Sequence, residues 1–380
     1  MELKIFVTGD NHFGMTYSKY PEVVREQLKN SRYECLQNMV DKAVEEGCEY
    51  FVVTGDMFET VNVKKSDVVK AIDILGSFSG GTVLIIPGNH DFYTGDGNEQ
   101  VWRYFKDASA GYSNVVLLNE YEPRDFGDII VYPAFCDKKH SDENKLDWIK
   151  NSDIDTDRIN IGIAHGAVEG LSLDSEVRYF YMSKKELNDI PVDAWLIGHT
   201  HVPFPGDLKE DDDKEGYKIF NAGTHEQTDV GNNTEGCGFI ITIDKADGKA
   251  AVKARKFVSG RIRHYDFKDV KVFPDNDNAL ETALKGCFSN ITDSQNSIVR
   301  INVTGTIKSD EYSRRGEIYK GFEGRFMSCT INDDDLAEEI TIDRINAEFS
   351  EDGVVAEFLR SISDNTELQM AYNLVKGMRE

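Results

Sequence analysis

The stretch Leu3-Lys4-Ile5-Phe6-Val7-Thr8-Gly9-Asp10-Asn11-His12 decides the fold of this chain. Residues 3–7 are mostly apolar and partly β-branched, which predicts a short buried strand. The strand ends at Gly9, and two side chains that could bind a metal ion, Asp10 and His12, follow at once. A single Asp-x-His triplet arises often by chance, so its weight depends on whether the arrangement recurs.

The arrangement recurs at four further apolar runs, each of which leads directly into Asp, Asn or His. They are residues 50–54 before Gly55-Asp56, 83–86 before Pro87-Gly88-Asn89-His90-Asp91, 161–164 before His165, and 194–197 before Gly198-His199-Thr200-His201. Helical patterns separate the first three strands, which predicts a parallel sheet with right-handed crossovers. Ligands of such sheets bind at the carboxyl ends of the strands. We therefore expect these side chains to meet in one site.

The side chains that would meet there are potential metal ligands of mixed type. They are Asp10, His12, Asp56, Asn89, His165, His199 and His201. Carboxylate, amide and imidazole donors without a thiolate suit manganese, iron or zinc. The set is too large for one tetrahedral ion and suits two ions about 3.5–4 Å apart. The expected cofactor is a pair of divalent metal ions, with manganese favoured.

The ordered motifs D-x-H, G-D, G-N-H-D, H and G-H-x-H resemble those of the calcineurin-like metallophosphoesterases over roughly residues 4–258. Within that superfamily the chain resembles the SbcD-type nucleases, the bacterial counterpart of the meiotic recombination nuclease. This closer resemblance rests on Phe13-Gly14, on Asn221-Ala222-Gly223-Thr224-His225-Glu226 leading to residues 238–241, and on residues 298–305.

The resemblance implies a role for each candidate residue. Asp56 would bridge the two ions. Asp10, His12 and His201 would complete one ion, and Asn89, His165 and His199 the other. The two ions would lower the pKa of a shared water, and the hydroxide would attack phosphorus in line. His90 would act near the leaving oxygen as a general acid, with Asp91 orienting it.

The resemblance also implies a function: a metal-dependent DNA nuclease with 3′-to-5′ exonuclease and single-strand endonuclease activity. Such a nuclease works in an SbcCD-type complex for double-strand-break repair and recombination, as a homodimer with an SbcC-type ATPase. Two alternatives remain open, a small-nucleotide phosphodiesterase and a mainly structural subunit of the complex. One position departs from the pattern, because Glu59 stands where the recombination nuclease has a second histidine, three residues after the bridging aspartate.

The composition bounds the protein class. With 40% hydrophobic and 29% charged residues, the 380-residue chain can form one large core and a smaller domain. The six cysteines are scattered, which argues against a zinc ribbon and predicts buried thiols. No apolar run is long enough for a membrane helix and no signal peptide opens the chain, so we expect a cytoplasmic protein without a membrane contact. The net charge of −25 is unusual for a DNA enzyme. Either it serves only solubility, or metal ions or a partner supply the positive charge that DNA binding needs.

The expected fold class is α/β: a two-sheet metallophosphoesterase sandwich flanked by helices, a small α/β capping domain and a helical tail. The domains are predicted at residues 1–267, 268–335 and 336–380. The tail has two helical patterns, residues 354–363 and 366–378, which would bind the ATPase or pack on the capping domain.

Several local predictions accompany this architecture. We expect Ser66 to cap a helix over residues 66–78 and Ser183 with Glu186 to form a capping box. Residues 141–149 read as a short helix, and residues 218–221, 238–243 and 250–258 as a β-meander with a turn at Asp247-Gly248. His140 and His264 read as surface residues, and His225 as a candidate for the rim of the site.

Overall fold

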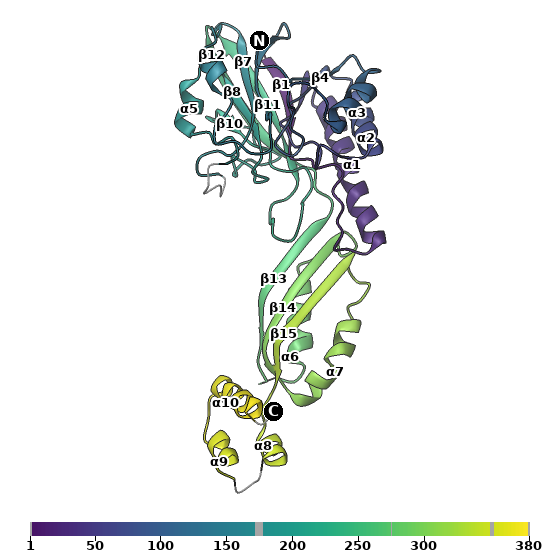
Figure 1. The fold of residues 1–380 in the computed structure, drawn as a ribbon, viewed down its shortest axis with the longest axis vertical. Helices are drawn as coiled ribbons and strands as arrows, with labels where there is room; N and C mark the ends of the chain where they lie inside the picture. Colours follow the sequence, from purple (N-terminus) through teal and green to yellow (C-terminus); the bar gives the residue numbers. More distant parts are fainter. Residues whose placement is uncertain (1, 172–177, 275, 350–352, 379–380) are drawn as a thin grey trace. The chain divides into compact units, whose positions relative to one another are not determined.

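The computed structural model describes residues 2–171, 178–274, 276–349 and 353–378. The chain divides into two compact units between Arg263 and His264, at the start of strand β13 (Arg263–Val272) (Figure 1). The domain boundary predicted near residue 267 falls within the same strand. Among the helices in the described ranges, none is both long enough and apolar enough to cross a bilayer.

The first unit contains a larger, mixed sheet with β1 in its middle. Its strands lie in the order β4 (Val115–Leu117), β3 (Thr82–Ile85), β2 (Tyr50–Val53), β1 (Glu2–Thr8), β11 (Cys237–Ala246), β12 (Lys249–Val258) and β9 (Lys214–Glu215). Strands β1 to β4 are parallel, as the alternation of strands and helices predicts. On its other side β1 pairs antiparallel with β11.

The second sheet of this unit is also largely parallel. Its strands lie in the order β10 (Ile219–Phe220), β8 (Ala194–Gly198), β7 (Ile159–His165), β6 (Ile129–Ala134) and β5 (Arg124–Asp125). Only the β5–β6 pair is antiparallel among the described pairs of this sheet. The predicted two-sheet α/β sandwich is confirmed.

The alternation of side chains along the strands sorts the core into layers. Ile5 and Val7 of β1 face a core shared with Ile161 and Ile163 of β7, between the sheets. Phe6, on the opposite face of β1, packs into a second core with the helices α1 (Glu22–Glu45), α2 (Lys65–Gly76) and α3 (Gln100–Ser109). The outer face of the smaller sheet packs with α4 (Asp147–Lys150) and α5 (Lys184–Asp189). Figure 1 shows α1–α3 and α5 on opposite sides of the unit.

The predicted β-meander is wrong at its first strand. β10 pairs in parallel with β8 in the smaller sheet, whereas β11 and β12 form a hairpin in the larger one. The hairpin turn is the predicted Asp247-Gly248 pair, with φ of 51° and 72°, the left-handed conformation that such a two-residue turn requires. Periodicity identified the strands but could not assign them to a sheet.

Two helix predictions also need correction. Helix α2 begins at Lys65, after Lys64 as the N-cap residue, so Ser66 is not its cap. Of residues 141–149, only Asp147 to Ile149 are helical, within α4, because Ser141 instead forms a β-bridge with Tyr179. The Ser183 cap of α5 is confirmed, since Ser183 Oγ accepts a 3.1 Å hydrogen bond from the backbone N–H of Glu186. The Glu186 carboxylate accepts from Asn144 Nδ2 and Lys150 Nζ instead, so the second half of the predicted capping box is not seen in the described residues.

The second unit contains a small α/β layer followed by a group of short helices. Strands β13, β14 (Ser297–Ile307) and β15 (Ser328–Glu338) form its sheet, and β14 and β15 are parallel. Helices α6 (Ala279–Phe288) and α7 (Ser309–Lys320) pack on this sheet through a core of their own. This layer agrees with the predicted small α/β domain.

The C-terminal helices are α8 (Ile342–Glu348), α9 (Val354–Arg360) and α10 (Asn365–Gly377). They share a small core that includes Ile345, Ala356, Leu359 and Tyr372. Helices α9 and α10 correspond to the two predicted tail helices, whereas α8 was not predicted.

Candidate metal centre

All the predicted ligands lie where parallel strands end. The loops after β1, β2 and β3 and the ends of β7 and β8 carry, in chain order, Asp10, His12, Asp56, Asn89, His165, His199 and His201. The two sheets therefore contribute ligands from opposite sides of the same site. Apart from His199 and His201, which are partly exposed, these residues are buried.

Asp10, His12 and His201 form the first ligand group. Their ligand atoms lie within 4.8 Å of one another. His12 Nε2 and His201 Nε2 are 2.9 Å apart, so the two imidazoles converge on one point. His12 Nε2 also lies 3.9 Å from Asp56 Oδ2.

Asn89, His165 and His199 form the second ligand group. Asn89 Oδ1 lies 3.0 Å from both His165 Nε2 and His199 Nδ1. His165 Nε2 is 3.3 Å from Asp56 Oδ2, the same oxygen that faces His12 in the first group. Asp56 thus stands between the two groups, which is the position that a bridging carboxylate needs.

The loops reach this arrangement through tight left-handed turns. Asp10, His12, Asp56 and His201 have φ of 50°, 47°, 49° and 55°, values that usually cost a non-glycine residue about 1–3 kcal/mol. Hydrogen bonds between the loops offset that cost: Asp10 N–H donates to Gly55 O, and His12 N–H donates to Asp56 O, both at 3.0 Å. Gly55 leaves room for the side chain of His165, because a Cβ at position 55 would lie only 2.3 Å from His165 Nδ1.

The electrostatics of the carboxylates fit a bound cation. Burial raises the pKa of Asp10 to about 6, partly offset by the charge of His165. Burial favours a higher pKa for Asp56 too. The neighbouring His165 and His12 outweigh this effect and hold the pKa of the Asp56 carboxyl well below its usual range. A cation would favour the charged form of Asp10 as well. The donor set of the site therefore fits divalent metal ions.

Two of the candidate ligand histidines, His201 and His165, differ in their protonation state. Burial, together with the charge of His12, lowers the pKa of His201 to about 2, so its ring is neutral and able to bind a metal. Burial favours a lower pKa for His165 as well. The negative charge of Asp56 outweighs burial and raises the pKa of His165 to about 9. A metal ion must displace that proton, so metal affinity is expected to rise with pH up to this pKa.

Comparison with known proteins identifies the family. The family model of calcineurin-like phosphoesterases matches residues 3–203, a stretch of 201 residues among 380 that includes both ligand groups. This chain belongs to that family.

Individual relatives are more distant. The chain is 24% identical over 228 residues to the uncharacterized metallophosphoesterase YhaO of Bacillus subtilis (strain 168), a match that covers 53% of this chain and 52% of that protein. It therefore spans about half the length of this curated relative. Similar solved structures include TT1561 of Thermus thermophilus (12% identity, TM-score 0.42, 68% of this chain and 100% of that one). Another is purple acid phosphatase PPD1 from yellow lupin (Lupinus luteus) seeds (13% identity, TM-score 0.38, 68% and 52%).

In this phosphoesterase, two ligand histidines contact residues outside the ligand groups through their other ring nitrogen. His165 Nδ1 lies 2.8 Å from the carbonyl oxygen of Thr54 and donates to it, which leaves Nε2 for a metal. His12 Nδ1 lies 2.9 Å from Glu59 Oε2, which leaves His12 Nε2 for the first ligand group. Glu59, the residue that departs from the nuclease pattern, therefore contacts a candidate ligand rather than lying apart from the site.

His90 lies at the edge of the site, and its expected orientation needs correction. Its backbone N–H donates to Asp56 Oδ1 at 2.7 Å, and its ring Nδ1 lies 3.0 Å from Glu59 O. Asp91 does not orient this ring. Its two carboxylate oxygens accept backbone N–H bonds from Gly88 and Phe58, at 2.7 and 3.0 Å. The catalytic role of His90 stays a prediction.

A buried arginine that the sequence did not single out supports the first loop. Arg32 of α1 is 1% exposed, and its guanidinium donates to Asn11 O at 2.8 Å, Tyr17 Oη at 3.2 Å and Thr224 Oγ1 at 3.3 Å. It thereby ties the loop after β1 to the loop before β11. An arginine in a helix is usually predicted to lie on the surface. Only the apolar residues near it along α1 indicated that it could be buried.

The remaining histidines differ from expectation in two cases. His140 is exposed, as expected, and its ring lies 5.0 Å from that of Tyr179, which lies 5.0 Å from that of His199. His225 is not on the rim: it is fully buried, with Nε2 2.9 Å from Arg32 O. His264 is also buried, at 6% exposure, rather than on the surface.

Proposed function

We propose that this phosphoesterase is a metal-dependent DNA nuclease with 3′-to-5′ exonuclease and single-strand endonuclease activity. The observation that carries the proposal is the position of Asp56 Oδ2 between the two ligand groups, 3.9 Å from His12 Nε2 and 3.3 Å from His165 Nε2. Such a pair of groups suits two ions that act together on one phosphate diester. Manganese is the proposed ion, since oxygen and imidazole donors suit it.

The chemistry divides between the ions and the chain. When bound, divalent ions supply positive charge that stabilises the negative charge developing on a phosphoryl group. The chain contributes a proton donor. With Nδ1 held at Glu59 O, a protonated His90 presents its Nε2–H as the free donor, and we assign it the transfer of that proton to the leaving oxygen.

The second unit favours a macromolecular substrate over a free nucleotide. A phosphodiesterase for small nucleotides needs only the first unit, which holds every candidate ligand. The second unit has its own core around β14 and α6, and exposed apolar residues on its last helices. Both features suit an enzyme that works in a larger assembly. A mainly structural role is disfavoured because every ligand position is filled.

The proposed assembly is an SbcCD-type complex for double-strand-break repair and recombination. Helices α9 and α10 leave Val354, Phe358, Met370 and Leu374 between 52% and 82% exposed. We assign this face to the coiled coil of an SbcC-type ATPase, bound as a helix in a groove. The partner would also contribute the DNA contacts that a chain of net charge −25 lacks. A cytoplasmic homodimer is proposed as well, which sedimentation of the purified protein would test.

The test compares substrates with manganese present. Purified protein is incubated with a single-stranded oligodeoxynucleotide and, separately, with a panel of cyclic and linear nucleotides. We expect cleavage of the oligonucleotide, and roughly 1000-fold less by Asp56→Asn purified in the same way, which controls for contaminating nucleases. Turnover of a nucleotide without cleavage of DNA would support the small-nucleotide alternative and overturn the proposal. No turnover of any phosphodiester would favour the structural role.

A further inference from the structure

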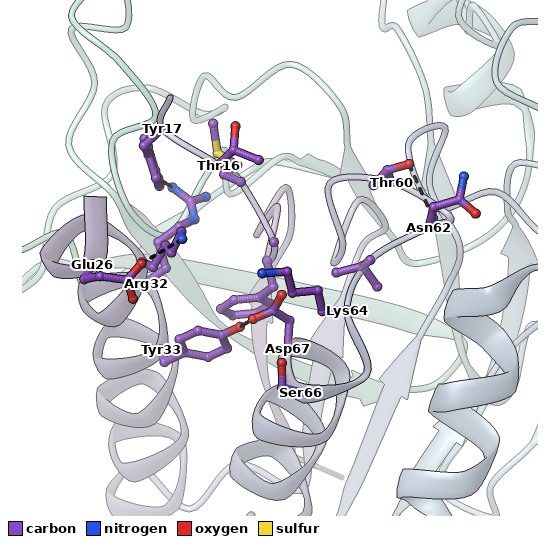
Figure 2. Close-up of a pocket in the computed structure, with 15 residues that line it drawn as sticks. Thr16, Tyr17, Glu26, Arg32, Tyr33, Thr60, Asn62, Lys64, Ser66 and Asp67 are labelled. Carbon is purple, nitrogen blue, oxygen red and sulfur yellow. Dashed lines mark hydrogen bonds and ion pairs between the residues drawn. The ribbon is translucent and has the colours of Figure 1, made fainter. Parts of the chain in front are cut away.

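A pocket of about 410 Å³ lies beside the metal centre, between the loop after β1, the first turns of α1, the loop after β2 and the start of α2 (Figure 2). This volume falls in the range of about 300–1,000 Å³ that is usual for small-molecule sites. None of the candidate metal ligands lines it. The pocket is therefore a space separate from the ligand groups, and it has no part in the chemistry assigned above.

The pocket and the metal centre share two loops. Phe13, which lines the pocket, directly follows His12, and Thr60, which also lines it, directly follows Glu59. The loops are tied together at this point: Phe13 N–H donates to Met57 O at 2.9 Å, and Glu59 N–H donates to Phe13 O at 3.0 Å. A molecule in the pocket would thus lie one residue along the chain from the residues that surround the metal centre.

The lining offers an apolar wall and groups of both charges. The partly exposed Met15 supplies accessible apolar surface, and the buried Phe13 and Val63 lie behind it. Asp67 Oδ1 accepts a 3.0 Å hydrogen bond from the hydroxyl of Tyr33, which leaves Oδ2 to accept another. A carboxylate would repel a simple anion such as free phosphate, so the lining suits a ligand that carries both donor groups and a negative charge.

The negative charge of such a ligand has one suitable partner in the lining. Lys29 already pairs with Glu26 at 2.9 Å, and the guanidinium of Arg32 is taken up by its hydrogen bonds to the loops. The ammonium of Lys64 has no hydrogen-bond or ion-pair partner among the residues that the structure describes. Figure 2 shows the Lys64 side chain reaching into the pocket toward Asp67.

We propose that this pocket binds the nucleotide that adjoins the scissile phosphate of a DNA strand, with Lys64 at its phosphate. A nucleotide combines a planar apolar surface, N–H donors and a phosphate, and the wall, Asp67 and Lys64 match these in turn. The inference rests on the proposed nuclease function and extends it. Binding in this pocket would make the enzyme prefer a polynucleotide to a phosphate diester that carries no nucleotide.

The test uses two substrates that differ in the group the pocket would bind. A short single-stranded oligodeoxynucleotide has a neighbouring nucleotide, whereas bis(p-nitrophenyl) phosphate has none. Lys64→Ala should lower kcat/KM for the oligonucleotide about tenfold and reduce the slope of log kcat/KM against log salt by about 0.7. Hydrolysis of bis(p-nitrophenyl) phosphate should stay unchanged. Lys65→Ala is the matched control, since Lys65 is exposed, pairs with Asp107 and does not line the pocket.

A second variant tests the space itself. Thr16→Trp fills the pocket from its exposed wall, and Ser18→Trp places the same side chain two residues away, on an exposed position outside the lining. Only Thr16→Trp should impair cleavage of the oligonucleotide while sparing bis(p-nitrophenyl) phosphate.

The outcomes separate the inference from the proposed function. If the unmodified protein cleaves DNA but Lys64→Ala and Thr16→Trp cleave it equally well, the pocket inference is overturned and the nuclease function stands. An equal loss on both substrates would also overturn it, because the pocket would then act through the metal loops. If the unmodified protein hydrolyses bis(p-nitrophenyl) phosphate but no oligonucleotide, the nuclease function and the inference fail together.

Discussion

The metal centre and the C-terminal helices depart from the usual distribution of side chains in opposite directions. At the metal centre, ionisable groups are buried: Asp10 is inaccessible to solvent and Asp56 is 1% exposed. On α9 and α10, apolar groups are exposed: Phe358 is 52% and Leu374 70% exposed. A buried carboxylate is costly unless it is paired or binds a metal, and an exposed apolar patch marks an interaction site. The buried carboxylates therefore fit a bound cation, and the exposed apolar side chains are the surface that we assign to the proposed protein partner.

The largest effect is expected from Asp56→Asn, which removes the negative charge between the two ligand groups. Both ions would lose a shared ligand, so manganese-dependent hydrolysis should fall roughly 1000-fold. Metal analysis should find about two manganese ions per unmodified chain and fewer in the variant. A plateau at one ion in the unmodified protein would show that the groups do not form a binuclear site.

His90→Ala separates catalysis from metal binding. Alanine keeps the backbone N–H that donates to Asp56 Oδ1 and removes only the ring. Hydrolysis should fall roughly 100-fold, as for the loss of a general acid, while the manganese content stays the same. Loss of manganese from this variant would mean that the ring serves the metal centre instead.

The exposed apolar face is best tested with Phe358→Glu combined with Leu374→Glu. Truncation of the tail is a poorer test, because Ala356, Leu359 and Tyr372 share a core with Ile345. We expect the double variant to bind an SbcC-type ATPase at least about 30-fold more weakly. Its stability should change by less than about 1 kcal/mol, since both positions are exposed.

Two measurements complete this test. Asn373→Glu, next to Leu374 but polar in the unmodified chain, should bind the ATPase normally in the same co-purification. The double variant should also retain its manganese-dependent activity. Unimpaired binding by the double variant would exclude this face as the docking surface.

The smallest effect is expected from Glu59→Gln. The substitution weakens the charged contact to His12 Nδ1 but leaves every ligand in place, so the dissociation constant for manganese should rise about tenfold. Isothermal titration with manganese measures it, and Glu45→Gln, at an exposed position, is the control. An unchanged dissociation constant would show that Glu59 does not support the metal centre.

The sequence predicted which side chains come together at the candidate metal centre better than it predicted their surroundings, for a physical reason. Each candidate ligand follows an apolar run, and parallel strands bring such positions to one edge, so local pattern and global geometry agree. Arg32 has no such signal. Its burial depends on Asn11, Tyr17 and Thr224, the last of them separated from it by 192 residues of chain. The burial of His225 against Arg32 O escaped prediction for the same reason.

Other errors came from competition between local and distant hydrogen bonds. Residues 141–149 have a helical pattern, yet the backbone of Ser141 bonds to Arg178 and Phe180 instead. His90 and Asp91 are neighbours in sequence, yet Asp91 serves the backbone of its own loop and of Phe58. Adjacency along the chain predicted a contact that the turn geometry does not make.

The place of β1 in the middle of the larger sheet has a consequence for synthesis of the chain. Its partner β2 follows within about fifty residues, but its other partner, β11, begins only at Cys237. At roughly 5–20 residues per second, a ribosome needs about ten to fifty seconds to deliver that strand after β1. Throughout that interval the nascent chain carries an open, apolar strand edge next to its unfinished first ligand loop. A chaperone that shields this edge during the interval would raise the yield of correctly folded chain.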